Sequence, residues 1–291
     1  IEKIEFIVKK AIKESNTNFK DLDGIAATAG PGLMVCLTVG LNMGKAIAGS
    51  LQKPFVAVNH LEGHALSPGI NKKIEFPYLL LLISGGHSQF LEVNGIDKYK
   101  RLGTTIDDAL GEAFDKTAKL LGIEFPGGPK IEEWAKKGDE NFFNLPKPIL
   151  KRGGCNLSFA GLKTAVLKIS KGLKDENEKY HLAASFQKVI NEILYEKTKV
   201  AMREFLKNKE IEEKFFVIAG GVASNLSIRN NLIKLAKEEK FISIFPPKNL
   251  CSDNAAMIAW AGIERYKINL VDNLEFPLKA RWPLDSSAPF L

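Results

Sequence analysis

Apolar and polar positions along the chain change period repeatedly, and each change predicts a new element of secondary structure. Helical spacing of apolar residues, about every third or fourth position, predicts amphipathic helices. They span residues 1–15, 38–51, 106–121, 130–137, 162–170, 180–207, 224–239 and 253–266. Short apolar runs of strand length predict buried strands. They span residues 23–29, 55–58, 78–83, 214–219 and 242–245, with a hairpin at 90–102. Strands and helices alternate twice over, which is typical of an α/β architecture in two lobes.

Two histidines stand where the strand at 55–58 gives way to a helical pattern. His60 and His64 are four residues apart, so both rings fall on one helix face and could chelate one zinc or iron ion. The alternative to a metal site is that the two histidines belong to an ordinary polar helix face. The zincin motif H-E-x-x-H is absent, because Leu61 follows the first histidine and Glu62 is turned about 100° further around the helix. The stretch therefore favours a metal site and disfavours a peptidase.

Four glycine-rich turns follow apolar segments, at residues 30–32, 84–86, 126–129 and 220–225. Glycine lets the backbone approach a ligand closely, and a following helix N-terminus adds a partial positive charge. Each could simply be a tight turn, but together they favour a nucleotide-like ligand. None is a Walker A loop or a G-x-G-x-x-G fingerprint, so P-loop and Rossmann folds find no support.

Carboxylates also mark candidate sites. Within the predicted helix 106–121, Asp107, Asp108, Glu112 and Asp115 are expected to form one acidic stripe, with Asp108 and Glu112 four apart and Asp107 and Asp115 eight apart. The stripe is either a solvated face or, through Asp115, an acceptor for ribose or amino-acid hydroxyls. Asp253 falls at a predicted helix N-cap, where it would be structural or would give the two histidines a third metal ligand.

Composition narrows the class of protein. The 291 residues are 45% hydrophobic and 26% charged with a mean hydropathy of −0.07, as in a soluble globular protein, and no apolar run approaches the ~20 residues of a membrane helix. Three cysteines without a CxxC pair favour a reducing cytoplasm. A net charge of +7 permits an anionic partner without requiring one.

With these residues in view, the sequence resembles the universal tRNA threonylcarbamoyladenosine transferase family in its bacterial form, TsaD. The resemblance rests on motifs such as Asn59-His-Leu-Glu-Gly-His and Ala219-Gly-Gly-Val-Ala-Ser-Asn, in family order over nearly the whole chain. The matching stretches are residues 28–33, 59–64, 82–89, 106–116, 126–129, 157–164, 183–187, 219–225, 251–259 and 281–284.

The resemblance implies a fold and an activity. The fold is the two-lobed, RNase H-like α/β fold of actin, Hsp70 and sugar kinases, with residues 1–76 and 254–291 in an N-terminal lobe and 77–253 in a C-terminal lobe. The activity is transfer of a threonylcarbamoyl group from threonylcarbamoyl adenylate to N6 of adenosine 37 in tRNAs reading ANN codons, with release of AMP. The implied partner proteins are TsaB and TsaE.

Site residues follow from the same resemblance. His60, His64 and Asp253 match the family's ligands for one divalent metal ion, Fe2+ or Zn2+. The positions that match the adenylate site are Leu82, Ile83, Ser84, Gly85, Gly86, Asp115, Gly128 and Asn225. Glu132 falls where many relatives have an aspartate. No side chain stands out as a base, so the expected mechanism is positioning and electrostatics.

The sequence departs from the family pattern at one place, and three alternative functions stay open. The family's usual opening strand and hairpin are absent, so the resemblance implies that the first strands of the N-terminal lobe are missing. The rivals are a kinase-like phosphotransferase on the same fold, a noncatalytic tRNA-binding subunit and a metallopeptidase. A kinase would need magnesium, whereas a histidine pair prefers a softer ion.

Overall fold

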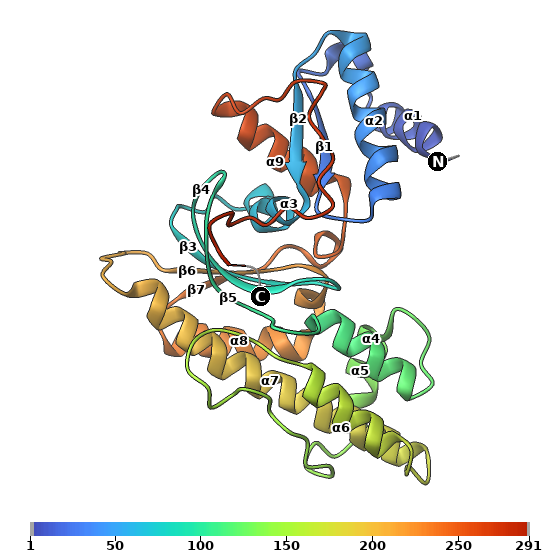
Figure 1. The fold of residues 1–291 in the computed structure, drawn as a ribbon, viewed down its shortest axis with the longest axis vertical. Coiled ribbons are helices and arrows are strands. Elements are labelled where there is room, and N and C mark those ends of the chain that lie inside the picture. Colours follow the sequence, from blue (N-terminus) through green and yellow to red (C-terminus); the bar gives the residue numbers. More distant parts are fainter. Residues whose placement is uncertain (1–2, 290–291) are drawn as a thin grey trace. The chain divides into compact units, whose positions relative to one another are not determined.

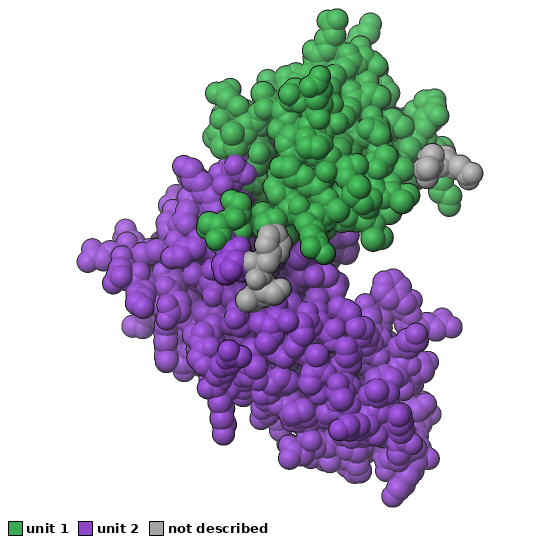
Figure 2. Space-filling view, viewed as in Figure 1, with its two compact units in different colours: residues 1–70, 254–287 green, residues 71–253, 288–291 purple. Residues whose placement is uncertain are grey.

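The structure is a computed structural model that describes residues 3–289. The chain divides into two compact units, one formed by residues 1–70 and 254–287 and the other by residues 71–253 and 288–291 (Figure 2). We refer to them as unit 1 and unit 2 and describe each by itself.

Unit 1 is a small α/β unit built on two parallel strands, β1 and β2, whose register pairs Ile25 with Phe55 and Thr28 with Val58. Helices α2 and α9 both pack on β1, as Figure 1 shows. In chain order its elements are α1 (Ile4–Glu14), η1 (Phe19–Asp21), β1 (Ile25–Gly30), α2 (Met34–Leu51), β2 (Phe55–Asn59), α3 (His60–Leu66), η2 (Ser67–Ile70) and α9 (Ala255–Lys267).

Small residues explain how the two helices approach this sheet. A Cβ added at Gly44 of α2 would lie 2.8 Å from the Ala27 Cβ, and one added at Gly262 of α9 would lie 2.4 Å from the Ala26 Cβ. The expectation that small residues allow the helix after β1 to pack closely is confirmed. Helix α2 begins four residues earlier than predicted. By length and composition α2 could also span a membrane; in the structure it packs on β1 and buries Leu37, Leu41, Gly44 and Ala48.

Unit 2 is a five-stranded sheet in the order β5-β4-β3-β6-β7, covered by helices. Strand β3 is central and wholly buried, antiparallel to β4 and parallel to β6. In chain order the elements are β3 (Tyr78–Ile83), β4 (Ser88–Gly95), β5 (Lys98–Thr104), α4 (Leu110–Leu120), α5 (Gly127–Ala135), α6 (Ala160–Ser170), α7 (Glu176–Leu206), β6 (Phe215–Ala219), η3 (Gly221–Ser224), α8 (Leu226–Glu238), β7 (Ile242–Ile244) and η4 (Lys248–Leu250).

The pairing of β3 with β6 positions the chemistry of unit 2. Leu82 stands opposite Ala219, so the two strands end at the same edge of the sheet. The turn at 84–87 and the glycine turn at 220–224 therefore leave the sheet side by side. In open α/β sheets this carboxyl edge is where ligands bind.

One predicted helix begins later than expected, which corrects the acidic stripe. Helix α4 starts at Leu110, so Asp107 and Asp108 precede it. Asp107 accepts hydrogen bonds from the Phe159 N–H at 2.8 Å, the Ala160 N–H at 3.2 Å and the Ser158 hydroxyl at 2.5 Å. The prediction of one helical stripe was wrong because these long-range bonds hold residues 105–109 in a loop.

Candidate substrate pocket and metal centre

A pocket of about 600 Å3 opens at the carboxyl edge of the unit 2 sheet. Six of the predicted substrate-binding residues line it, namely Ser84, Gly85, Asp115, Gly128, Glu132 and Asn225. Gly86 is exposed in the same turn as Ser84 and Gly85. Leu82 and Ile83 are fully buried in β3 and do not line the pocket with their side chains.

Close backbone approaches bring the segments around this pocket together. The Gly111 N–H donates to the Ser84 carbonyl at 3.1 Å, and a Cβ at Gly111 would lie 2.7 Å from that oxygen. Gly220 has a φ of +96°, and a Cβ there would lie 2.3 Å from the Ile83 carbonyl oxygen. These two glycines let α4 and the 220–224 turn lie directly against the end of β3.

Three polar side chains of the pocket also hold helix ends. The Gly127 N–H at the start of α5 donates to Asp115 Oδ1 at 2.9 Å. The Ile228 N–H in the first turn of α8 donates to the Asn225 side-chain oxygen at 2.9 Å. The Leu226 and Ser227 N–H groups both donate to Glu132 Oε1, at 2.8 and 3.2 Å.

This capping changes one expectation about the glycine turns. The sequence predicted that the N-terminus of the helix after the turn at 220–225 adds a partial positive charge beside a ligand. In the structure the N–H groups of Leu226, Ser227 and Ile228 are all bonded to protein side chains. The N-terminus of α8 is therefore a structural junction, with Asn225 further fixed by donating to Gln187 Oε1 at 2.8 Å.

The remaining lining residues were not predicted individually. The apolar wall comes from Phe114, Phe125, Pro126, Pro129 and Val222. The two prolines and Val222 belong to glycine-rich turns that the sequence had singled out, so their signal was present. Phe114 and Phe125 carried none, because an aromatic residue in a helix or before a proline is more often core. Such a wall with a few convergent polar groups suits an organic ligand.

The predicted metal ligands come together. His60 and His64 lie on α3, and Asp253 directly precedes Asn254, the N-cap of α9. One ligand atom from each of the three lies within 4.8 Å of the others, and the two imidazole centroids are 4.9 Å apart. Two imidazoles and a carboxylate are a donor set that fits zinc or iron. Asp253 also lines the pocket.

Two acidic groups near the histidine motif take roles other than those expected. The N-cap of α9 is Asn254, whose side-chain oxygen accepts from the Met257 N–H at 2.8 Å, so Asp253 was misplaced by one position. Glu62 contacts Arg265 Nη1 at 2.8 Å and is 1% exposed. Its carboxylate is thus engaged by a guanidinium, unlike the glutamate base of a zincin.

An ion cluster stands beside the start of α4. Asp108 pairs with Lys163 and, at 3.2 Å, with Lys116, which also pairs with Glu112. Burial raises the pKa of Asp108, but the hydrogen bonds from the two lysines outweigh it and leave that pKa below the ordinary value. The cluster ties α4 to α6.

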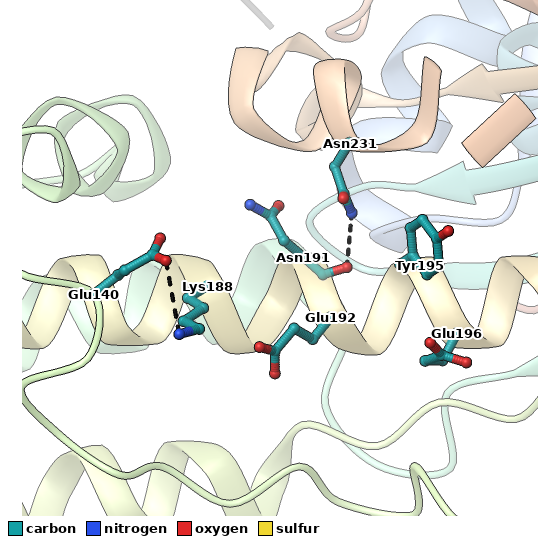
Figure 3. A pocket seen from close by; sticks show the side chains of 7 residues that line it. All are labelled: Glu140, Lys188, Asn191, Glu192, Tyr195, Glu196 and Asn231. Atoms are coloured by element: carbon teal, nitrogen blue, oxygen red, sulfur yellow. Dashed lines mark hydrogen bonds and ion pairs between the residues drawn. The ribbon is translucent and has the colours of Figure 1, made fainter. Parts of the chain in front are cut away.

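A second hollow of about 300 Å3 lies along α7 (Figure 3). Several of its polar groups are bonded to other protein groups: Lys188 pairs with Glu140 at 3.6 Å, and the Asn231 side-chain amide donates to the Asn191 carbonyl at 2.8 Å. A hydrogen bond to Glu238 raises the pKa of Tyr195 to about 12. Because these side chains already bond other protein groups, we assign this hollow no ligand.

Comparison with known proteins places the chain in a family. The family profile described as "TsaD: tRNA N6-adenosine threonylcarbamoyltransferase" matches residues 1–260. The chain belongs to the TsaD family. A tRNA N6-adenosine threonylcarbamoyltransferase of Pelagibacter ubique (strain HTCC1062) is 67% identical over 291 residues, which are 100% of this chain and 82% of that protein. The enzyme of that name from Zymomonas mobilis (strain ATCC 31821 / ZM4 / CP4) is 49% identical over 290 residues, 99% of this chain and 79% of its own.

As a TsaD-family member the chain is an acyltransferase that modifies tRNA. Its structural neighbours include HypF from T. kodakarensis, with a TM-score of 0.64 and 16% identity over 91% of this chain and 44% of that one. Full-length HypF in the phosphate- and nucleotide-bound form has a TM-score of 0.57 and 14% identity, over 78% and 38%. At such identities the likeness shows the fold alone. Together with the family match it confirms the predicted actin, Hsp70 and sugar-kinase-like α/β class.

Proposed function

We propose that this TsaD-family chain transfers the threonylcarbamoyl group of threonylcarbamoyl adenylate to N6 of adenosine 37 in tRNAs reading ANN codons, releasing AMP. The observation that carries the proposal is the unit 2 pocket, in which Ser84, Gly85, Asp115, Gly128 and Asn225 converge from four separate turns and helices. Its volume of about 600 Å3 lies within the range of sites for ligands of nucleotide size. Leu82, Ile83, Gly86 and Glu132 complete the proposed substrate site.

Each group has a proposed role. The exposed Gly85 and Gly86 offer their backbone N–H groups to phosphate or carbonyl oxygens, since neither has an atom within 4 Å of an added Cβ, whereas the Ser84 N–H donates to the His87 carbonyl at 2.8 Å. Asp115 and Glu132 each use one named oxygen for a helix end, which leaves the second oxygen of each to accept ligand hydroxyls. The aromatic rings of Phe114 and Phe125 provide an apolar wall for the adenine ring of the adenylate.

His60, His64 and Asp253 are the proposed ligands of one divalent ion, Fe2+ or Zn2+. A bound ion would act as a Lewis acid that holds the donor and offsets charge developing on it. The protein's own share of the reaction is then to hold the donor's carbonyl carbon within reach of the adenosine amine. We further propose TsaB and TsaE as partner proteins and the cytoplasm as the compartment, where three free cysteines stay reduced.

The test supplies the chain with preformed threonylcarbamoyl adenylate, an ANN-decoding tRNA transcript, TsaB and TsaE. Modified adenosine 37 is followed by mass spectrometry and AMP release by chromatography. We expect His60→Ala to lose modification by at least about a hundredfold, consistent with loss of a metal ligand. His181→Ala is the matched control, because His181 accepts from the Asp139 N–H at 2.8 Å and does not line the pocket.

Two results would contradict the proposal. One is equal modification of adenosine 37 by the wild type and His60→Ala, which would mean that the reaction does not depend on a metal ion held by His60. The other is ATP consumption with a sugar acceptor and no modified adenosine, which would favour the kinase-like alternative.

A further inference from the structure

Helix α3 carries both histidines but is only seven residues long. A helix this short has no stability of its own in water, so its orientation must come from what it packs against. All of its residues except His60 are buried. The direction of the two imidazoles therefore depends on the contacts that the buried residues of α3 make.

One flank of α3, beside the histidine face, lies against α9 of the same unit. A Cβ added at Gly63 would lie 2.8 Å from Ile258 Cδ1 and 3.3 Å from Met257 Cγ, so the backbone of α3 rests directly on α9 side chains. One turn of apolar contact fixes the separation of two helices better than it fixes rotation about the helix axis, because apolar contacts are not directional.

The directional contact is a buried ion pair. Glu62 Oε2 lies 2.8 Å from Arg265 Nη1, and the two side chains are 1% and 8% exposed. At 100° per residue, Glu62 points about 200° from His60 and about 200° from His64, the reverse side of α3 from the ligand face. Arg265 thus contacts α3 on the side opposite the histidines. Rotation of α3 about its own axis would move Glu62 away from Arg265 and break the ion pair.

Stability alone is a poor explanation for this pair. Removing two charges from water costs several kcal/mol per ion, and replacing a buried pair by apolar residues of similar volume is often neutral or stabilising. Helix α9 also begins at Ala255, two residues after Asp253, with Asn254 as its N-cap. Helix α9 therefore carries the arginine that pairs with Glu62 of α3, and it starts beside the third ligand.

We propose that Glu62 and Arg265 are positioning residues that set the rotation of α3 and so present His60 and His64 to a metal ion. The inference rests on the proposed metal site but concerns residues that are not ligands. It predicts that the pair can be exchanged for an apolar one with the fold kept and the metal affinity lost.

The experiment measures two properties of the full chain without any substrate. Apo stability is measured by thermal unfolding, and metal binding by titration with Zn2+ alone and by the visible spectrum of the Co2+-loaded protein, which reports ligand geometry. The variants are Glu62→Leu/Arg265→Met, Arg265→Lys, His60→Ala and the control Glu264→Gln. Glu264 is on the same helix and pairs with Lys267 at the surface, at 2.8 Å.

We expect the double variant to unfold near the wild-type temperature while its Zn2+ affinity falls at least about tenfold and its Co2+ spectrum changes, the loss typical of groups behind metal ligands. Arg265→Lys keeps the charge but not the planar fork, and we expect it to fold and to lose affinity severalfold. If the double variant does not fold, the Zn2+ affinity of Arg265→Lys tests the positioning role in its place. Glu264→Gln should match the wild type in both measurements.

Two different failures can be told apart. If Arg265→Lys and the double variant bind Zn2+ as the wild type does, with the same Co2+ spectrum, while His60→Ala does not bind, the positioning role alone is refuted. If His60→Ala binds Zn2+ as tightly as the wild type, the proposed metal site is refuted and this inference with it.

Discussion

Glu132 offers a direct way to separate structural from ligand roles in the pocket. Its Oε1 accepts from the Leu226 and Ser227 N–H groups across 94 and 95 residues of sequence. The carboxylate therefore joins α5 to the N-terminus of α8, where it also lies favourably in the helix dipole. Glu132→Ala should free both N–H groups at once.

The loss can be estimated from these two bonds. A side-chain cap is worth typically about 1 kcal/mol and a charge at a helix N-terminus about 0.3–1 kcal/mol. Water can reach the freed groups, because Leu226 is 39% exposed, which keeps the sum near the lower end of the range for charged hydrogen bonds. We expect Glu132→Ala to cost about 2 kcal/mol, or a Tm drop of about 4–8 °C for a unit of this size.

Two further variants sharpen the test. Glu132→Gln keeps an acceptor of the same length and should lose only about 1 kcal/mol, the charge contribution. Glu132→Asp keeps the charge but is one methylene shorter, so it should lose the bonds to α8 and resemble the alanine variant. Glu133→Gln is the control, since Glu133 is 50% exposed, pairs only with surface lysines, and should change stability by less than about 0.5 kcal/mol.

The assay is urea or thermal unfolding, with AMP affinity measured in parallel by calorimetry. The reasoning is refuted if Glu132→Ala unfolds at the temperature of Glu133→Gln, because the two hydrogen bonds would then contribute nothing. Weaker AMP binding at unchanged stability would instead make Glu132 a ligand residue only.

Three further predictions follow from single sites. Gly220→Ala would place a Cβ 2.3 Å from the Ile83 carbonyl oxygen at a φ of +96°, so we expect a loss of about 4 kcal/mol, seen as a Tm drop above about 8 °C. Asp108→Asn should be less stable than the wild type at neutral pH. Because the folded-state pKa of Asp108 is lowered from 3.8, that gap should persist to about pH 4 and narrow as the pH falls through the lowered value in urea titrations. A thiol reagent at about pH 8 should label exposed Cys36 alone in the native protein, since burial raises the pKa of Cys155 to about 11; rapid labelling in Cys36→Ser would contradict this.

Periodicity predicted most elements of the fold. Residues 78–83, six consecutive apolar positions, form β3 over the same span, and the strand predicted at 55–58 is one residue longer as β2. Helix starts were less certain, because they depend on contacts made far along the chain. Asp107 looked like part of a helix until the structure paired it with residues 158–160.

The candidate site divides in the same way. The histidine pair could be predicted because its spacing is local and a helix face suffices to bring both rings together. Glycine turns indicated where the pocket would be, yet nothing local showed that Asp115 would cap α5 or that Glu132 would reach α8. Those bonds join separate elements, and Glu132 and Leu226 are 94 residues apart, so local spacing did not predict them.

The double use of pocket side chains has a consequence for how activity data should be interpreted. Asp115, Glu132 and Asn225 each stabilise a helix end that lines the pocket, so removing one changes the wall as well as the ligand contact. An inactive alanine variant at these positions therefore does not by itself identify a substrate contact. The same holds at the metal centre, where Glu62 and Arg265 could lower activity without touching an ion. Binding and stability measured on one set of variants separate these causes, because a positioning residue can lose affinity while the fold is kept.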